Sequence, residues 1–545
     1  DARATAMSSP PWSPTRERHG HYEELAQVDE YGTIRPASFA DDLSDQASDD
    51  ALVHHDDSSG WAQTPAWNIC LNAAMYCAVP LSMPATLAAG GWFWGTVFFA
   101  YTTAATYWTG LVIGRVYLEH PRLATYPAMA SEAFHNLALE RTADARVARH
   151  WRTWSRRAVK ITQFVTFYLD TVTQMIYVAQ YFAQLDLGWF GTTGRDEGEI
   201  QSDSPAGHAR LCQWAWVLVV WAVSVPVMQI PTFHASRWVI VPAVAVLAIA
   251  VALFLYEVVA VVKPWSCHPG PSFGGVTWRS AMVSLGNFAY AWGGHGVFPE
   301  SLREMREPHR WPSVMRWMYA GLVPVYVVCS IVGYAGYGQF AQANINLNFP
   351  KNWVNGVSIT LQLLQCYYLI FYTNVVLVLM VETRWGIDPT KTWHPRVSLP
   401  VIGSTSPAVA RLLFRTAFLG TQVALAEWFI TSASEDVILD LQALTGSVGM
   451  AAMTFFIPSA LAWGLLPRNQ LSDGDTRWCV VNLVGGAFIA LTGVITATMD
   501  LASDGGDGGR CELRYTYAPN DPGDPCFVSG INGAGGHPAP TLGEL

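Results

Sequence analysis

The chain has 545 residues, of which 51% are hydrophobic and only 14% are charged, with 24 tryptophans. A soluble domain usually carries about a quarter charged residues, so this composition excludes an ordinary soluble enzyme. The formal net charge of -10 comes without any basic patch, and we therefore expect no nucleic-acid partner.

Residues 1–63 are rich in Ser, Pro, Asp and His and hold few large apolar side chains. Such a segment cannot bury enough apolar surface to offset the entropy lost when a chain becomes ordered. We predict a disordered cytoplasmic tail over residues 1–63.

Residues 64–499 form the predicted membrane domain, an all-α multi-pass protein that lies in a lipid bilayer. Apolar runs near twenty residues long cross about 30 Å of hydrocarbon as helices. Because a backbone in lipid must satisfy its own hydrogen bonds, the runs are predicted to be helices rather than open strands. We predict eleven spans, at 67–89, 92–118, 161–186, 212–230, 238–262, 276–300, 315–338, 353–381, 410–431, 438–466 and 479–499.

The distribution of Lys and Arg predicts the orientation. Basic residues collect after the second, sixth and eighth spans, for example Arg149, Arg303 and Arg415, and we assign these stretches to cytoplasmic loops. The N-terminus is then cytoplasmic, and an odd number of spans makes residues 500–545 an extracytoplasmic tail. The pattern leaves open a plasma membrane or a vacuolar or lysosomal type of membrane.

Four cysteines fall at the predicted outer face, where oxidation permits disulfides. They are Cys212, Cys267, Cys511 and Cys526. Of the three possible pairings we favour Cys212 with Cys267 and Cys511 with Cys526, and unpaired thiols are the alternative.

The first span contains Pro80 and Pro84, and each proline removes a helical hydrogen bond and clashes with the preceding turn. We predict that the helix opens near Cys77 to Leu81. Peptide groups freed in lipid persist only when buried in protein or lining a watery cavity, which favours a binding site. A simple kink relieved by a neighbouring helix is the alternative.

The middle of the sixth span reads Ala291-Trp292-Gly293-Gly294-His295-Gly296. Glycine weakens a helix and allows close backbone approach. Interruptions in the first and sixth spans are typical of an inverted-repeat transporter with a midplane site. The alternatives are close helix packing for the glycines and a hydrogen-bonded core histidine for His295.

Asp170 lies nine residues into the third span, about 13 Å deep at 1.5 Å per residue. Buried carboxylates at this depth generally mark ion or substrate paths, so Asp170 is our first candidate for a proton carrier. A structural acid is the alternative. Thr373 and Asn374 of the eighth span are candidates for contact with an ion or substrate or, equally, for packing hydrogen bonds. Polar residues at helical spacing predict that one stripe of the third span faces the interior: Gln163, Thr166, Asp170, Thr173, Gln174, Tyr177 and Tyr181.

Several motifs together resemble the amino acid/auxin permease family, most of all its lysine/histidine transporter branch in plants. They are Leu285 to Glu300 with its Gly-His and closing Glu, Glu307-Pro308, Gly333 to Gly338, and Ile230 to His234, within a similarity from Trp67 to Met499. The resemblance implies eleven helices, the first ten in two inverted five-helix repeats, and amino acid transport coupled to protons or sodium.

In that family the opened first helix presents amides to the substrate carboxylate, and the sixth presents carbonyls to its amino group. Carried over, the implied substrate-binding residues are Cys77, Ala78, Val79, Pro80 and Leu81, with Trp292, Gly293, Gly294 and His295. The family usually has Gly-x-Gly where this chain has Cys77-Ala78-Val79, followed by Pro80 without an amide donor. This departure predicts a narrower pocket with one donor fewer. Asp170 has no counterpart in the family pattern.

We therefore predict a secondary active transporter with alternating access, taking an amino acid or a related zwitterion with protons or sodium. A non-transporting amino acid sensor or a structural membrane subunit is the alternative. We expect no enzyme, cofactor or metal site, because His295 with Glu300 is too small a set for catalysis.

Overall fold

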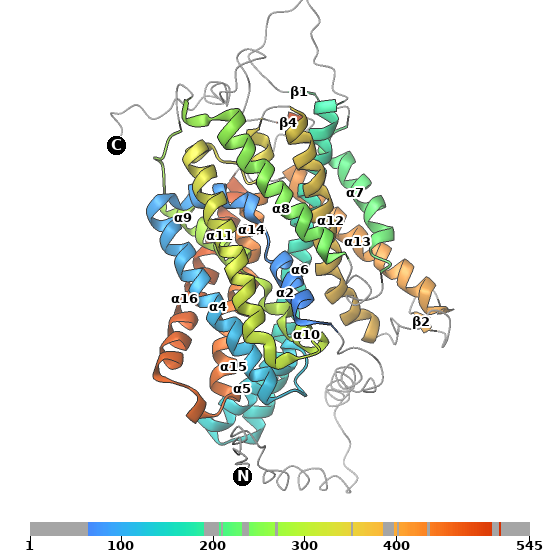
Figure 1. Cartoon of the computed structure of the whole chain (residues 1–545). Helices are drawn as coiled ribbons and strands as arrows, with labels where there is room; N and C mark the ends of the chain where they lie inside the picture. The colour runs from blue at the N-terminus through green and yellow to red at the C-terminus, as the bar shows by residue number, and fades with distance from the viewer. Residues whose placement is uncertain are drawn as a thin grey trace, which may run out of the picture. The chain divides into compact units, whose positions relative to one another are not determined.

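The computed structural model describes residues 64–189, 207–208, 211–230, 239–266, 271–349, 352–384, 397–399, 403–432, 437–503 and 512–513. The tail predicted over residues 1–63, and most of residues 500–545, lie outside this part. Its helices, shown in Figure 1, are α2 (Ala66–Tyr76), α3 (Met83–Gly90), α4 (Thr96–Glu119), α5 (Tyr126–Thr142), α6 (Ala145–Trp189), α7 (Gln213–Val227), α8 (Ile240–Tyr256), α9 (Trp278–Ala291), α10 (Phe298–Glu304), α11 (Trp311–Tyr337), α12 (Trp353–Arg384), α13 (Pro407–Ser432), α14 (Val437–Thr445), α15 (Ile457–Leu465) and α16 (Asp473–Ser503).

Strands are few and short within the described ranges. β1 (Gly207–His208) pairs with β4 (Glu512–Leu513), and β2 (Val397–Leu399) pairs with β3 (Gly403–Thr405), both antiparallel. The fold is thus built from helices, as predicted.

Seven helical stretches of the described chain are long and apolar enough to cross a membrane. They are Ala66–Glu119, Ile240–Val262, Pro308–Phe340, Trp353–Glu382, Pro407–Thr431, Val437–Leu465 and Asp473–Leu501. The first of them covers two predicted spans. Three predicted spans remain. The span 161–186 falls on α6 with its polar stripe, 212–230 falls on α7, which has only 15 residues, and 276–300 falls on the separate helices α9 and α10. The chain is a multi-pass membrane protein, whereas eleven crossings and inverted repeats stay predictions.

α6 corrects one prediction from the sequence. It begins at Ala145 and continues for 45 residues, so the basic stretch before residue 161 is helical and not a loop. No proline or glycine interrupts the sequence from Ala145 to Leu187, and nothing there ends a helix. Arg152 on this extension pairs with Glu132 of α5 at 2.9 Å, which ties the two helices together.

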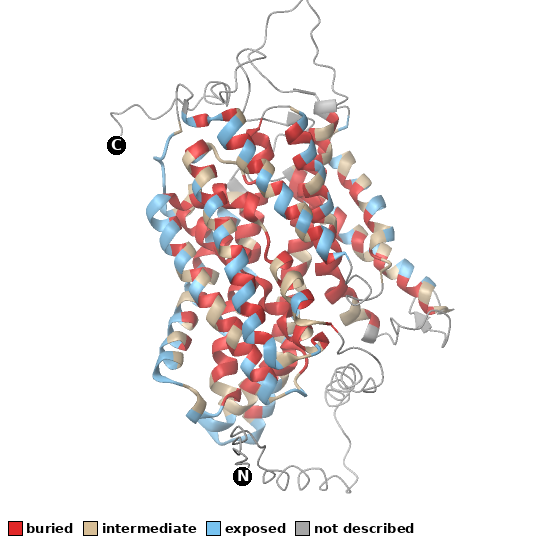
Figure 2. Cartoon of the chain, in the orientation of Figure 1, coloured by how far each residue is buried: buried red, intermediate tan, exposed pale blue. Residues whose placement is uncertain are grey.

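Burial separates central helices from outer ones. In the most apolar window of Trp353–Glu382 and of Val437–Leu465, 72% of the residues are buried, against 28% in Ile240–Val262 and 33% in Asp473–Leu501. Figure 2 shows the buried residues between the helices and the exposed ones on outward faces. An apolar row of exposed side chains runs along α16: Val480, Val484, Phe488, Leu491, Ile495 and Met499. A face of this kind is suited to contact with lipid.

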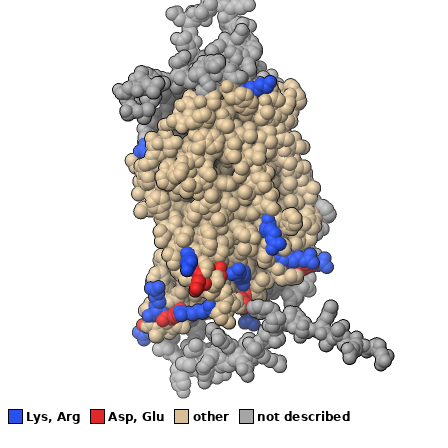
Figure 3. Space-filling view, turned by 60° about the vertical axis from the view of Figure 1, so that its left-hand side comes forward, with Lys and Arg blue, Asp and Glu red and all other residues tan. Residues whose placement is uncertain are grey.

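Charged side chains gather toward one end of the face in Figure 3, below a wide uncharged band. α5, the start of α6 and the start of α11 lie at one end of Figure 1, and exposed arginines there include Arg141, Arg149 and Arg310. Arg415 corrects a second prediction. It lies within α13 with a fully buried side chain paired to Glu382, and not in a cytoplasmic loop.

Close packing of α9 against α14 and the helical turn that follows it (Gly446–Met450) rests on glycines. A Cβ atom added at Gly446 would lie 2.1 Å from the Gly286 carbonyl oxygen, and one added at Gly286 would lie 2.9 Å from the Ala443 carbonyl oxygen. We expect Gly446→Ala to lower the free energy of unfolding by about 2 kcal/mol, because overpacking forces the helices apart. Thermal unfolding of the purified protein measures this.

Gly321→Ala is the matched control, because no heavy atom lies within 4 Å of a Cβ added there. This exchange within α11 should leave stability unchanged or raise it by about 0.5–1 kcal/mol. Equal melting temperatures for the two variants would show that the contact between α9 and α14 is not close enough to exclude a methyl group.

Candidate functional site

The first predicted span is interrupted where the prolines indicated. α2 ends at Tyr76, the residues from Cys77 to Val79 leave the helix, and a 3₁₀ turn from Pro80 to Ser82 leads into α3. Pro80 occupies the first position of that turn, where a missing amide hydrogen costs nothing. The predicted opening of this helix is confirmed.

The second predicted interruption is present as well. α9 ends at Ala291, and the Gly293 amide then donates to the Tyr290 carbonyl at 2.9 Å. A 3₁₀ turn from Gly294 to Val297 leads into α10. The two interruptions lie against each other, since a Cβ atom on Gly294 would stand 2.8 Å from the Cys77 sulfur.

One hydroxyl group joins the two interruptions. Tyr326 of α11 directs its hydroxyl at the Cys77 carbonyl and, at 3.3 Å, at the Ala291 carbonyl. The same oxygen accepts a hydrogen bond from the Val79 amide at 3.2 Å. Peptide groups released by both breaks therefore share one partner. Sequence reasoning missed Tyr326, because a tyrosine within an apolar helix carries no local signal.

Aromatic rings surround this junction. Trp292 is fully buried and stacks on Tyr319, with ring centroids 4.7 Å apart and planes 7° apart. Its ring centroid also lies 4.9 Å from that of Tyr326. The Trp292 indole nitrogen has no hydrogen-bond partner among the described residues. A buried donor without a partner is costly, so this nitrogen is a candidate for contact with a bound molecule.

A hollow with a cavity volume of about 40 Å³ adjoins the first interruption. We call it the first hollow. Ala78, Val79, Pro80 and Leu81 line it, together with polar groups from α6 and α12 that include Gln174, Tyr177, Tyr181, Gln362 and Gln365. Gln365 donates to the Ala78 carbonyl at 2.8 Å. Cys77 and the predicted residues of the sixth span are not part of this lining.

The amides of the first interruption are few, as the departure from Gly-x-Gly predicted. Pro80 has none, and the Val79 amide is already bonded to Tyr326. A ligand that used the Val79 amide would have to displace the tyrosine hydroxyl.

Asp170 lies within the bundle, with an exposed fraction of 5%. Its carboxylate accepts a hydrogen bond from Tyr290, and Gln174 donates to the same tyrosine oxygen at 3.2 Å. Tyr290 stands in the last turn of α9, directly before the second interruption. All seven residues of the predicted polar stripe are buried, so the inward orientation of that stripe is confirmed.

The other candidates make contacts between helices. The Nε2 atom of His295 lies 2.9 Å from the Thr109 hydroxyl and 2.9 Å from the Thr106 carbonyl oxygen. Thr373 bonds the Thr171 hydroxyl of α6 at 2.8 Å. The side-chain amides of Asn374 and Gln422 exchange hydrogen bonds at 3.1 and 2.8 Å. None of these three candidates lines the first hollow. Their contacts are hydrogen bonds between packed helices, which is one of the alternatives that the sequence left open.

No group of three or more His, Cys, Asp or Glu side chains within the described ranges is arranged to hold a metal ion.

The apolar outer helices, the paired interruptions and the polar hollow beside them define an integral membrane protein of the transporter class. The chain belongs to the family of transmembrane amino acid transporter proteins, which it matches over residues 59–499. The family resemblance is thereby confirmed, and the chain is not an enzyme. The finer resemblance to the lysine/histidine branch stays a prediction.

Three relatives from Arabidopsis thaliana are similar to this chain. Amino acid transporter AVT1B is 22% identical over 307 residues, which are 56% of this chain and 50% of the relative. Amino acid transporter AVT1D is 21% identical over 424 residues, or 78% of this chain and 67% of the relative. Amino acid transporter AVT1C is 22% identical over 314 residues, or 58% and 50%. The chain thus spans half of the length of AVT1B and AVT1C.

Proposed function

We propose that this protein moves amino acids across a membrane as a secondary active transporter. The observation that carries the proposal is the pair of interrupted helices joined by the Tyr326 hydroxyl beside the first hollow. Family membership and the names of the Arabidopsis relatives support amino acids as the substrate class. Peptide groups released from helical pairing inside a membrane domain are a usual means of holding a small zwitterion.

In this proposal the residues from Cys77 to Leu81 receive the substrate carboxylate, and those from Trp292 to His295 receive its ammonium group. A zwitterion placed between them would replace the contacts that Tyr326 now makes with both segments. The first hollow would serve as the approach from one side of the membrane. Alternating access requires that the substrate bind the states open to each side with different contacts.

The coupled ion in this proposal is a proton, with sodium as the second possibility. We assign the coupling to Asp170, with Thr373 and Asn374 as further candidates. Asp170 holds Tyr290 at the end of α9, so its protonation would replace a charge-assisted hydrogen bond by a weaker neutral one. The end of α9 would then be freer to move with the second interruption. Inverted five-helix repeats are part of the same proposal.

Uptake into proteoliposomes tests the function. Radiolabelled amino acids should accumulate against their gradient when a pH gradient is imposed, and a sodium gradient applied separately tests the second ion. Binding of an amino acid with no flux under either gradient would select the alternative, a sensor or a structural subunit.

Asp170→Asn is expected to reduce accumulation driven by the pH gradient about tenfold or more, because the variant cannot exchange a proton. Exchange of labelled for unlabelled amino acid across the membrane should continue. Asp186→Asn is the control, since Asp186 lies on the same helix and accepts a hydrogen bond from the Leu211 amide at 3.3 Å. Undiminished pH-driven accumulation by Asp170→Asn would remove Asp170 from the coupling step.

The basic residues at one end of the molecule support a cytoplasmic N-terminus and an extracytoplasmic C-terminus, in a plasma membrane or a vacuolar or lysosomal type of membrane. The proposed disulfides are Cys212 with Cys267 and Cys511 with Cys526. Cys267, Cys511 and Cys526 lie outside the described residues, so the pairing stays a prediction. Peptide mapping under non-reducing conditions tests it.

A further inference from the structure

The first turns of α6 carry a row of exposed side chains along one face of the helix. These turns precede the predicted span 161–186, and the structure shows that they are helical. Residues three or four positions apart share one face of a helix, and five exposed residues follow one another at this spacing. We call them the α6 stripe: Arg146, His150, Trp154, Arg157 and Ile161.

The α6 stripe lies in a strongly basic part of the chain. Between Asp144 and Asp170 the sequence holds five arginines and one lysine, and no acidic residue. Arg152, on another face of α6, pairs with Glu132 of α5 at 2.9 Å, whereas Arg157 is exposed. So many like charges on one stretch of helix produce a positive field around it. The field favours a partner with negative charge.

Two large hydrophobic side chains belong to the same stripe. Ile161 is 64% exposed and Trp154 is 53% exposed. The Trp154 ring packs edge to face on Trp151 with centroids 5.3 Å apart, and Trp151 stacks on Phe134 of α5 at 6.3 Å. Tryptophan is enriched where a membrane meets water, and an exposed isoleucine next to it is suited to acyl chains. The partner of the stripe therefore needs apolar surface as well as negative charge.

The rise of the helix orders the stripe relative to the membrane. Ile161 is the first residue of the predicted span, and at 1.5 Å per residue Arg157 lies about 6 Å outside it along the axis. Arg146 lies about 22 Å outside it. The layer of lipid headgroups on each side of the hydrocarbon is about 5–7 Å thick. Arg157 is thus at the level of the headgroups, and Arg146 is well beyond them.

We propose that the α6 stripe binds an anionic phospholipid of the surrounding membrane, with the headgroup phosphate on the Arg157 guanidinium and an acyl chain along Ile161. A planar guanidinium donates two parallel hydrogen bonds to phosphate oxygens. A zwitterionic lipid has the same phosphate, but the arginines around the site repel its quaternary ammonium group. A free phosphate ion has the charge but leaves Ile161 and Trp154 without an apolar contact.

The test is binding of dioctanoyl phosphatidylserine to the purified full chain in a neutral detergent, measured by isothermal titration calorimetry at constant ionic strength. We expect it to bind more tightly than dioctanoyl phosphatidylcholine. Arg157→Gln should reduce this preference about fivefold, which is the effect of one basic residue at a membrane surface. Arg157→Lys keeps the charge and should retain most of the preference.

Arg146→Gln is the matched control, because it removes the same charge from the same exposed face of α6. Arg146 lies about 16 Å from Arg157 along the helix, which is about two screening lengths at physiological ionic strength. We therefore expect the preference for phosphatidylserine to change less than about twofold in this variant.

An unchanged preference in Arg157→Gln would overturn the proposal. Equal weakening by Arg157→Gln and Arg146→Gln would also overturn it, because the effect would then come from the overall charge and not from a site at headgroup level. Equal affinity for the serine and choline lipids counts against it in the same way, as does equal affinity for glycerol 3-phosphate, which has no acyl chain. Trp154→Ala should weaken the binding of phosphatidylserine, and it decides the question alone if Arg157→Gln does not give folded protein.

Discussion

Replacing Tyr326 by phenylalanine is expected to abolish transport and to lower the free energy of unfolding by about 3 kcal/mol. The exchange removes one hydroxyl and leaves the Cys77 carbonyl and the Val79 amide without that partner. The Val79 amide and the Cys77 carbonyl keep their mutual hydrogen bond of 3.2 Å, so the loss is that of the three hydrogen bonds of the hydroxyl, each with a usual net contribution of about 1 kcal/mol. Transport is lost in the same variant, because the two interrupted segments no longer share a common anchor. Uptake into proteoliposomes and thermal unfolding measure the two effects.

Tyr319→Phe is the matched control for this variant. Tyr319 also belongs to α11 and packs on Trp292, but its hydroxyl donates to a single side chain, that of Thr106, at 2.8 Å. We expect a loss of about 1 kcal/mol, the usual net contribution of one hydrogen bond. If the two variants were equally stable and equally active, the Tyr326 hydroxyl would not be what joins the two interruptions.

The interruptions could be predicted because their cause is local. Pro80 and Pro84 remove helical hydrogen bonds wherever the segment folds, and the glycines around His295 weaken a helix in any context. The burial of Asp170 followed from its depth in the span and from the spacing of its polar neighbours, and it is confirmed.

Partners from distant parts of the chain could not be predicted in this way. The Tyr326 hydroxyl and the Cys77 carbonyl are 249 residues apart, and the Arg415 guanidinium and the Met228 carbonyl are 187 residues apart. Sequence periodicity says which face of a helix is buried, but it does not say what that face meets. The sequence alone therefore places Arg415 in a basic loop, although its partner Glu382 lies inside the bundle.

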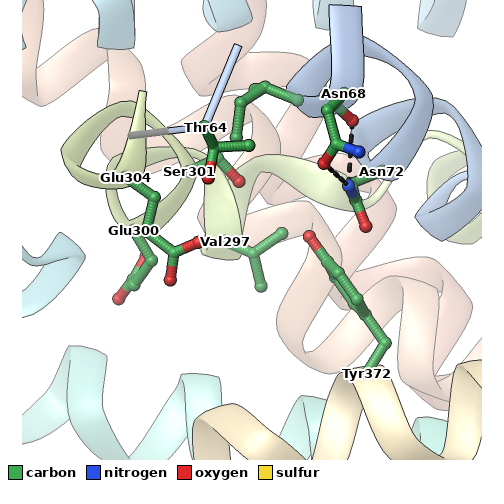
Figure 4. Close-up of a pocket in the computed structure, with 9 residues that line it drawn as sticks. Thr64, Asn68, Asn72, Val297, Glu300, Ser301, Glu304 and Tyr372 are labelled. Atoms are coloured by element: carbon green, nitrogen blue, oxygen red, sulfur yellow. Dashed lines mark hydrogen bonds between the residues drawn. The ribbon is translucent and has the colours of Figure 1, made fainter. Parts of the chain in front are cut away.

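The half-helices α2 and α10 are also joined through the backbone, near Thr64 and Glu304 in Figure 4. The Thr64 amide, just before α2, donates to the Glu304 carbonyl at 3.1 Å, and the Arg306 amide donates to the Thr64 carbonyl at 3.0 Å. These two bonds connect the start of α2 with the end of α10. The proposed alternating access would then move these two segments as one unit.

Breaking the ion pair between Arg415 and Glu382 is expected to have the largest effect on stability. Both side chains are fully buried, and the guanidinium meets the carboxylate through two hydrogen bonds of 2.7 and 2.8 Å. The remaining guanidinium nitrogen donates to the carbonyls of Met228 and Ile230 at 2.5 and 2.9 Å. Arg415 therefore connects α13, α12 and the end of α7.

Arg415→Met leaves the Glu382 carboxylate buried without its partner, which typically costs about 3–5 kcal/mol. We expect a strong loss of thermal stability and of folded protein in detergent. Arg468→Met is the control, because Arg468 pairs with Glu140 at an exposed site where the side chain of Arg468 is 84% exposed. Exposed pairs contribute about 0–1 kcal/mol, so this control should melt close to the unaltered protein.

The double variant Arg415→Met with Glu382→Leu separates the cost of an unpaired charge from the loss of a contact. With both charges replaced by apolar groups of similar volume, most of the lost stability should return, since such exchanges are often neutral. Thermal unfolding of the single and double variants provides the comparison. If the double variant melted as low as Arg415→Met, the bonds from Arg415 to the end of α7, rather than the charge balance with Glu382, would be what stabilises this corner of the bundle.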